Sequence, residues 1–211
     1  MSSTSLTRLQ IDVARAFFAL PESVGFVLAG GAALIAQGLV ARETDDLDFF
    51  AGRSHGDVAL AADALATACS AVGCLVETIG AGPEFRRLKI TRAEAEELYV
   101  DLAIDSPPDS TPTVTLAGPT LAPRDLAIRK TLALFSRAEP RDFADVYVMH
   151  RHFERGDLLA AVAEADPGFE IDVFIQMLRA HRRLRDEDFP AADVDVETLR
   201  TYFDRWADEL R

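Results

Sequence analysis

Cysteine is scarce in this sequence, and its scarcity excludes two classes of protein. The only two cysteines, Cys69 and Cys74, are too few for a disulfide framework. Their spacing also fails to match a Cys-x-x-Cys metal knuckle. The first residues lack the apolar segment and small-residue cleavage site of a secretory signal. We therefore expect a cytoplasmic protein that works in a reducing environment.

Positive charge is also in short supply. The chain has 22 Lys and Arg against 35 Asp and Glu, a formal net charge of −13 at pH 7. This balance argues against tight, nonspecific binding to nucleic acid, because phosphate contacts need Lys and Arg. Residues 179–185 differ from the rest, since they contain four arginines and no acid. The sequence therefore leaves open a local basic patch on an acidic protein.

We also expect no membrane-spanning helix. One uncharged stretch, residues 24–41, is long enough to raise the question. Glycines interrupt it at Gly25, Gly30, Gly31 and Gly38, and its pattern changes at the glycine pair from strand-like to helix-like. We predict a buried strand, a turn and a helix, and no membrane association.

The 211 residues, 49% of them hydrophobic, are enough to bury a substantial core. Hydrophobic periodicity predicts strands at residues 24–29, 47–51, 75–79, 85–90 and 98–104. It predicts helices at residues 6–20, 32–38, 58–72, 123–137, 141–153, 156–165, 170–185 and 194–210. A proline-containing loop follows the last strand. We therefore predict an α+β fold, with a mixed-sheet core in residues 1–118 and a helical domain in residues 119–211 that completes a cleft.

Asp46 and Asp48 are the first candidates for chemistry. They lie at the start of a predicted strand, whose period of two places both carboxylates on one face and Leu47 on the other. Adjacent carboxylates repel unless a cation neutralises them, and oxygen ligands of this kind suit Mg²⁺. A solvated acidic turn is the alternative for an isolated Asp-x-Asp pattern.

Two further features strengthen the Mg²⁺ interpretation. Gly30 and Gly31 follow a buried strand and open a helix, where backbone N–H groups favour phosphate oxygens, although a turn without a ligand fits too. Asp101 lies between Val100 and Leu102 in a predicted strand, and buried strands seldom carry an unpaired aspartate. Asp105 lies on the same face nearer the loop, so we rank it second as a third carboxylate.

Lys130 lies on the apolar side of its predicted helix, and Asp145 lies on the next helix. An antiparallel helix pair would bring the two side chains to one wall of a cleft. A structural salt bridge or a snorkelling lysine would explain the same pattern.

Four segments in order resemble a known family. They are residues 28–34 (LAGGAAL) with 42–50 (RETDDLDFF), residues 125–134 (DLAIRKTLAL) and residues 141–147 (RDFADVY). Together they are similar to the motifs of the AbiEii/AbiGii toxin family, which includes MenA-type toxins. The resemblance implies a polymerase-β-like nucleotidyltransferase fold and a nucleoside triphosphate donor. It also implies a cognate antitoxin and, for MenA-type members, the 3′ end of tRNA as acceptor.

On this resemblance we expect Asp46, Asp48 and Asp101 to hold Mg²⁺ for an in-line displacement at the α-phosphorus. Gly30, Gly31, Thr44 and Lys130 would contact the phosphates. Asp145 would orient Lys130 or the nucleotide, and Arg42 shapes the preceding loop.

The sequence also departs from the family at two positions. Ala32 stands where many relatives have a hydroxyl residue, and Ala41 stands where a histidine is frequent. The first departure removes one expected hydrogen bond to phosphate. Three alternatives stay open: nucleotidylation of a protein, nucleotidylation of a small molecule of the aminoglycoside kind, and a non-catalytic nucleotide-binding module.

Overall fold

A computed structural model of the chain describes residues 6–54, 56–92, 96–190 and 195–211. The chain forms two compact units. One, the sheet unit, contains residues 1–38 and 43–122. The other, the helical unit, contains residues 39–42 and 123–211. The α+β class predicted from the sequence is confirmed.

Seven strands form one mixed sheet in the described part of the sheet unit, in the order β3-β4-β5-β2-β1-β7-β6. Their bounds are β1 Phe26–Ala29, β2 Asp46–Gly52, β3 Leu75–Gly82, β4 Phe85–Arg92, β5 Glu96–Asp105, β6 Thr113–Thr115 and β7 Gly118–Thr120. β2 runs parallel to β5, and β7 runs parallel to β1. The other neighbouring pairs are antiparallel.

The five longer strands fall where the sequence predicts them, but β6 and β7 are additions within the segment expected to be a loop. Because β7 pairs with β1, the chain leaves the sheet unit after Ala122 and not at the expected boundary near residue 118.

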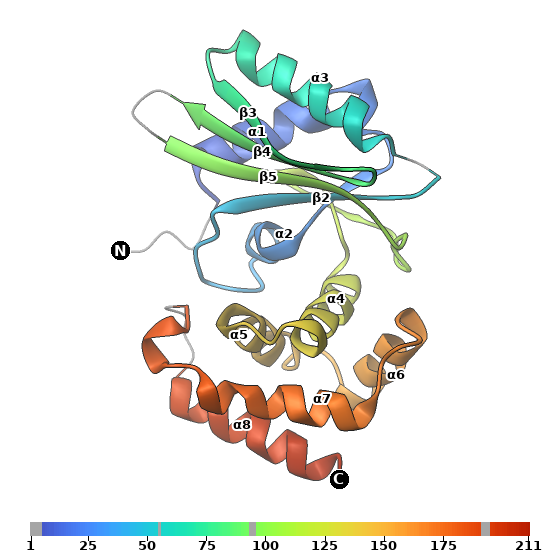
Figure 1. Cartoon of the computed structure of the whole chain (residues 1–211), viewed down its shortest axis with the longest axis vertical. Coiled ribbons are helices and arrows are strands. Elements are labelled where there is room, and N and C mark those ends of the chain that lie inside the picture. The colour runs from blue at the N-terminus through green and yellow to red at the C-terminus, as the bar shows by residue number, and fades with distance from the viewer. Residues whose placement is uncertain (1–5, 55, 93–95, 191–194) are drawn as a thin grey trace. The chain divides into compact units, whose positions relative to one another are not determined.

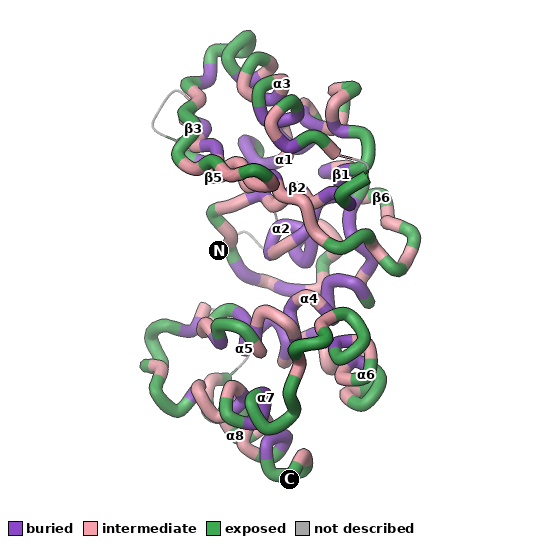
Figure 2. Tube along the Cα trace, turned by 45° about the vertical axis from the view of Figure 1, so that its right-hand side comes forward, coloured by how far each residue is buried: buried purple, intermediate pink, exposed green. Residues whose placement is uncertain are grey.

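Two helices, α1 (Arg8–Phe18) and α3 (Val58–Ala71), cover one face of the sheet, and α2 (Gly30–Ala36) lies on the other side (Figure 1). The covered face is apolar because alternate strand residues point to it. Leu47, Phe49, Val100 and Leu102 are fully buried there. Figure 2 shows buried residues along α2 and β1 of the sheet unit.

The helical unit packs around one aromatic core. Its helices are α4 Pro123–Ser136, α5 Pro140–Met149, α6 Arg155–Ala165, α7 Ile171–Leu178 and α8 Val196–Glu209, with 3₁₀ segments η3 Arg179–Arg183 and η4 Asp186–Asp188. Phe143, Phe174, Phe203 and Trp206 fill the centre of the core. The helix expected over residues 170–185 ends at Leu178 and continues as η3. Val194, the expected start of the last helix, lies outside the described residues.

None of the described helices has the length and apolar character needed to cross a membrane. Cys69 and Cys74 are both buried and free.

Candidate active site

Three carboxylates lie on one face of the sheet. β2 and β5 are parallel, and their register sets Asp48 opposite Asp101 and Asp46 opposite Tyr99. Since side chains alternate between faces, Asp46, Asp48 and Asp101 point away from the apolar face. All three are half-buried. The structure therefore brings together the carboxylates that the sequence predicts as a set.

The register also separates Asp101 from Asp105. Asp101 lies opposite Asp48, whereas Asp105 lies opposite Gly52 at the end of the strand. Oδ1 of Asp105 accepts a hydrogen bond from the backbone N–H of Ser106 at 2.7 Å. Asp101 is thus the better candidate for the third carboxylate.

Asp101 is electrostatically strained. Burial raises the pKa of its carboxyl above the ordinary value, the charge of Arg87 lowers it in part, and the negative charge of Asp46 raises it further. Its Oδ1 atom is buried and accepts no hydrogen bond from the described residues. The nearest cationic group is Nε of Arg87 at 3.5 Å, too far for a strong hydrogen bond. A bound cation would stabilise the ionised form of this carboxylate, because its Oδ1 atom lacks a hydrogen-bond partner among the described residues.

The donor set of this face fits Mg²⁺. No group of three His, Cys, Asp or Glu among the described residues forms a ready-made metal cage. Mg²⁺ seldom uses such cages, because it keeps several waters and binds through one or two carboxylates together with substrate phosphates. Three half-buried oxygen donors on one face, one with an unsatisfied oxygen, match that pattern.

Gly30 lies against the Asp48 carboxylate. Its φ of +63° is in the left-handed region that glycine adopts readily. A Cβ atom at this position would lie 2.6 Å from Cγ of Asp48 and would overlap Oδ2. Gly31 follows it, buried in the first turn of α2, and Ala32 is fully buried. The glycine pair therefore leaves space for the carboxylate of Asp48.

Replacing Gly30 by alanine should reduce any activity that depends on Asp48 by at least about tenfold, because the new methyl group displaces the carboxylate. Gly38→Ala is the matched control. Gly38 has a φ of +68°, and a Cβ there meets nothing within 4 Å. Both variants should lose about 1 kcal/mol of unfolding free energy from the left-handed backbone, and Gly30→Ala should lose more. Equal activities in the two variants would show that the close contact with Asp48 is unimportant.

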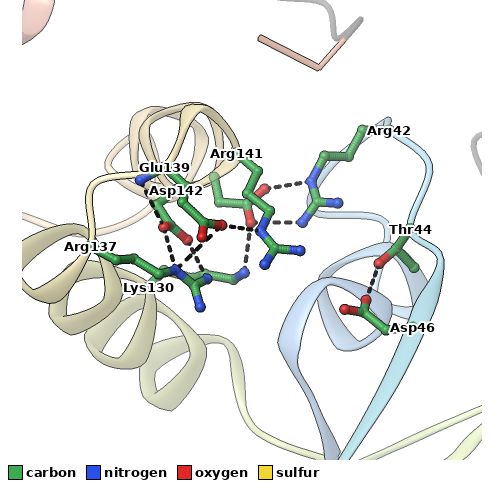
Figure 3. Close-up of polar contacts among 9 residues, drawn as sticks. Arg42, Thr44, Asp46, Lys130, Arg137, Glu139, Arg141 and Asp142 are labelled. Carbon is green, nitrogen blue, oxygen red and sulfur yellow. Dashed lines mark hydrogen bonds and ion pairs between the residues drawn. The ribbon is translucent and has the colours of Figure 1, made fainter. Parts of the chain in front are cut away.

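Thr44 holds Asp46 in place through a hydrogen bond from Oγ1 to Oδ1 at 2.6 Å (Figure 3). The backbone carbonyl of Thr44 in turn accepts a hydrogen bond from Nε2 of Gln10 at 2.7 Å. Oε1 of the buried Gln10 accepts from the N–H of Thr7 and completes the capping box of α1. The start of α1 thus positions the approach to β2. Sequence reasoning missed Gln10, although the Thr7-x-x-Gln10 spacing is a capping signal.

Lys130 and Asp145 form a buried ion pair in the helical unit. Nζ of Lys130 lies 2.8 Å from Oδ2 of Asp145, whose side chain is fully buried. Arg42 completes the group, since its Nε and Nη2 donate to the two oxygens of Asp145 at 2.8 Å each (Figure 3). We name this group the Asp145 triad. The sequence suggested the pairing of Lys130 with Asp145 but gave Arg42 only a loop-shaping role.

The triad keeps Asp145 ionised. Burial alone would raise the pKa of this carboxyl, but the charges of Lys130 and Arg42 and their hydrogen bonds outweigh burial and hold the pKa below its ordinary value. A second buried aspartate, Asp142, accepts from Arg137 at 2.8 Å and from the N–H of Glu139, so it caps α5.

The arginines of residues 179–185 do not form an isolated basic patch. Arg179 lies 2.7 Å from Asp208, Arg182 lies 2.7 Å from Asp204, and Nη2 of Arg185 lies 2.6 Å from Oδ1 of Asp188. Acids of α8 and η4 therefore neutralise most of this stretch, and it supplies little support for binding RNA.

A family model identifies the family of this chain, and similar solved structures show its fold. A family model described as "Nucleotidyl transferase AbiEii toxin, Type IV TA system" matches residues 13–210. The fold is similar to that of JHP933 from Helicobacter pylori, with 18% identity, a TM-score of 0.58 and coverage of 98% of this chain and 93% of the other. It is equally similar to MenT4, a nucleotidyltransferase toxin from Mycobacterium tuberculosis, with 14% identity, a TM-score of 0.58 and coverage of 98% and 90%. None of the curated proteins matches the sequence.

Proposed function

Because the chain belongs to the AbiEii nucleotidyltransferase toxin family, we propose that it is a magnesium-dependent toxin that modifies tRNA. It transfers a nucleoside monophosphate from a nucleoside triphosphate to the 3′ end of tRNA and releases pyrophosphate. The observation that carries the proposal is the face of the sheet on which Asp48 and Asp101 lie in register, with Asp46 beside them. The tRNA acceptor is the finer part of the proposal and rests on the resemblance to MenA-type toxins.

In the proposed reaction the acceptor hydroxyl oxygen attacks the α-phosphorus as the bond to the bridging oxygen of pyrophosphate breaks. Oδ1 of Asp101, which accepts no hydrogen bond from the described residues, accepts the hydroxyl proton. Asp46, Asp48 and Asp101 would hold Mg²⁺, which, when bound, neutralises the charge that develops on the phosphates. Thr44 fixes the orientation of Asp46, and Gly30 leaves the space that Asp48 needs.

The remaining roles concern phosphate. The backbone of Gly30 and Gly31 contacts the triphosphate, and Lys130 contributes positive charge. Arg42 binds both oxygens of Asp145, so Lys130 can turn to a phosphate without leaving that carboxylate unneutralised. Asp145 then acts by orienting Lys130. A purely structural triad is the alternative, and the effect of Lys130→Met on activity decides between the two.

A labelled-transfer experiment tests the function. The purified protein is incubated with Mg²⁺, total tRNA and each α-labelled nucleoside triphosphate in turn. We expect label at the tRNA 3′ end, its loss on chelation of the metal, and growth arrest when the protein is expressed alone in bacteria. Co-expression of the antitoxin that the family implies should relieve the arrest.

The other outcomes identify the alternatives. Label in a protein fraction would indicate a protein acceptor. A harmless protein that leaves tRNA unlabelled would favour a small-molecule acceptor. Nucleotide binding without any transfer would indicate a non-catalytic module and overturn the proposal.

A further inference from the structure

The polar face of the sheet continues beyond Asp101 onto β4. Register places Arg87 opposite Asp101 and Lys89 opposite Tyr99. Two rows of side chains therefore cross β4, β5 and β2 in that order. One row consists of Arg87, Asp101 and Asp48, and the other consists of Lys89, Tyr99 and Asp46. The rows put a cation and an aromatic ring immediately beside the three carboxylates.

Arg87 is held without being fully engaged. Its guanidinium carbon lies 5.4 Å from the centre of the Tyr99 ring, which is cation–π distance. Its Nε lies 3.5 Å from Oδ1 of Asp101, and its side chain is 40% exposed. Lys89 differs, because its Nζ lies 2.6 Å from Glu97 and that hydrogen bond raises the pKa of the lysine. Arg87 is therefore the cation on this face that is best placed to bind an incoming anion.

An exposed guanidinium over an aromatic ring suits one class of ligand. Guanidinium groups bind phosphate through paired N–H donors, and aromatic side chains stack on unpaired bases. The Asp101 carboxylate beside them is the proposed acceptor of the hydroxyl proton. A terminal nucleotide presents these features together, since it carries a phosphodiester, a base and a free hydroxyl.

We propose that Arg87 binds the last phosphodiester of a single-stranded polynucleotide acceptor and that Tyr99 stacks on the base of its terminal nucleotide. This inference rests on the proposed function. The acceptor is thereby recognised at its end, next to Asp101. Since the chain is strongly acidic, few other phosphate contacts are available to it. Binding of the acceptor should therefore depend only weakly on salt.

The test combines kinetics with direct binding. In Arg87→Gln the KM for a single-stranded oligoribonucleotide acceptor should rise on the order of tenfold, while the KM for nucleoside triphosphate stays unchanged. Fluorescence anisotropy of the labelled oligoribonucleotide, without nucleotide or Mg²⁺, should show the same loss of affinity. A plot of the logarithm of the association constant for the oligoribonucleotide against the logarithm of the salt concentration has a negative slope, and the magnitude of this slope should decrease by about 1 in Arg87→Gln. Tyr99→Phe should bind like wild type, and Tyr99→Leu should bind more weakly.

Arg92→Gln is the matched control. Arg92 lies on the same strand, but it points to the opposite face and pairs with Asp12 at 3.1 Å and Glu96 at 2.7 Å. Its loss removes the same charge and should leave acceptor binding unchanged.

Two results would overturn the inference. A fall in kcat with unchanged affinity for the oligoribonucleotide would mean that Arg87 acts only by neutralising Asp101. If wild type and Arg87→Gln transferred the nucleotide to a small-molecule or protein hydroxyl at the same rate, a polynucleotide would be excluded as the acceptor. If the wild type transferred nothing, the proposed function would fail, yet an Arg87-dependent loss of oligoribonucleotide binding would still support this site.

Discussion

Asp48→Ala should lower the rate of nucleotidyl transfer by about a thousandfold and leave the protein folded. The carboxylate lies in register with Asp101 on the polar face, so its loss removes several kcal/mol of charge stabilisation from the transition state. The melting temperature without metal should rise slightly, because one of three neighbouring negative charges is gone. Single-turnover transfer of an α-labelled nucleotide and a thermal melt measure the two effects.

Asp45→Ala is the control for Asp48→Ala. Asp45 precedes the same strand, and its side chain is exposed. Its replacement removes the same charge and should leave transfer near the wild-type rate. Growth arrest should likewise disappear for Asp48→Ala and persist for Asp45→Ala. Near-normal transfer by Asp48→Ala would show that the metal assignment is wrong.

Asp145→Ala should destabilise the helical unit by about 3–5 kcal/mol. The substitution leaves two buried cations, Arg42 and Lys130, without the carboxylate that neutralises both. Lys130→Met should cost much less stability, because Arg42 still binds both oxygens of Asp145 and methionine preserves the apolar stem. Chemical denaturation followed by circular dichroism measures both variants.

Two controls separate this effect from ordinary surface pairing. Asp208→Ala breaks an ion pair with Arg179 in which the aspartate is 67% exposed, so it should change stability little. Replacing all three triad residues by apolar ones should recover much of the lost stability, since no charge stays buried. An Asp145→Ala protein as stable as wild type would contradict the role of Asp145 as the carboxylate that neutralises two buried cations.

The triad also fixes the pH range in which it contributes. The pKa of Asp145 is lower in the folded protein than the ordinary value of about 3.9. Its contribution to stability is therefore fully present above the ordinary value. It is lost as the pH falls through the lower folded value.

The helices and strands that the sequence predicts well are those long enough to show a clear hydrophobic periodicity. The strands around Asp48 and Asp101 alternate cleanly, and this alternation gave both the strands and the shared face. β6 and β7 were missed because they have three residues each and β7 contains Pro119, which normally argues against a strand. α7 was overextended because the apolar pattern of residues 170–185 continues through η3.

The candidate site shows the same division. Asp46 and Asp48 are two residues apart, so their shared face follows from local geometry. The hydrogen bond between Arg42 and Asp145 joins residues that are 103 positions apart, so no local sequence pattern predicts it. Arg87 reaches Asp101 only through the register of the antiparallel pair of β4 and β5, which no local pattern in either strand fixes.

The short segment 39–42 has a consequence for how the protein is made. It belongs to the helical unit, although the rest of that unit begins at residue 123. During translation at about 5–20 residues per second, Arg42 is synthesised about 5–20 s before its carboxylate partner Asp145. The helical unit therefore completes its folding only after the sheet unit has been synthesised. A nascent chain stalled before Asp145 would expose an arginine that the finished protein buries.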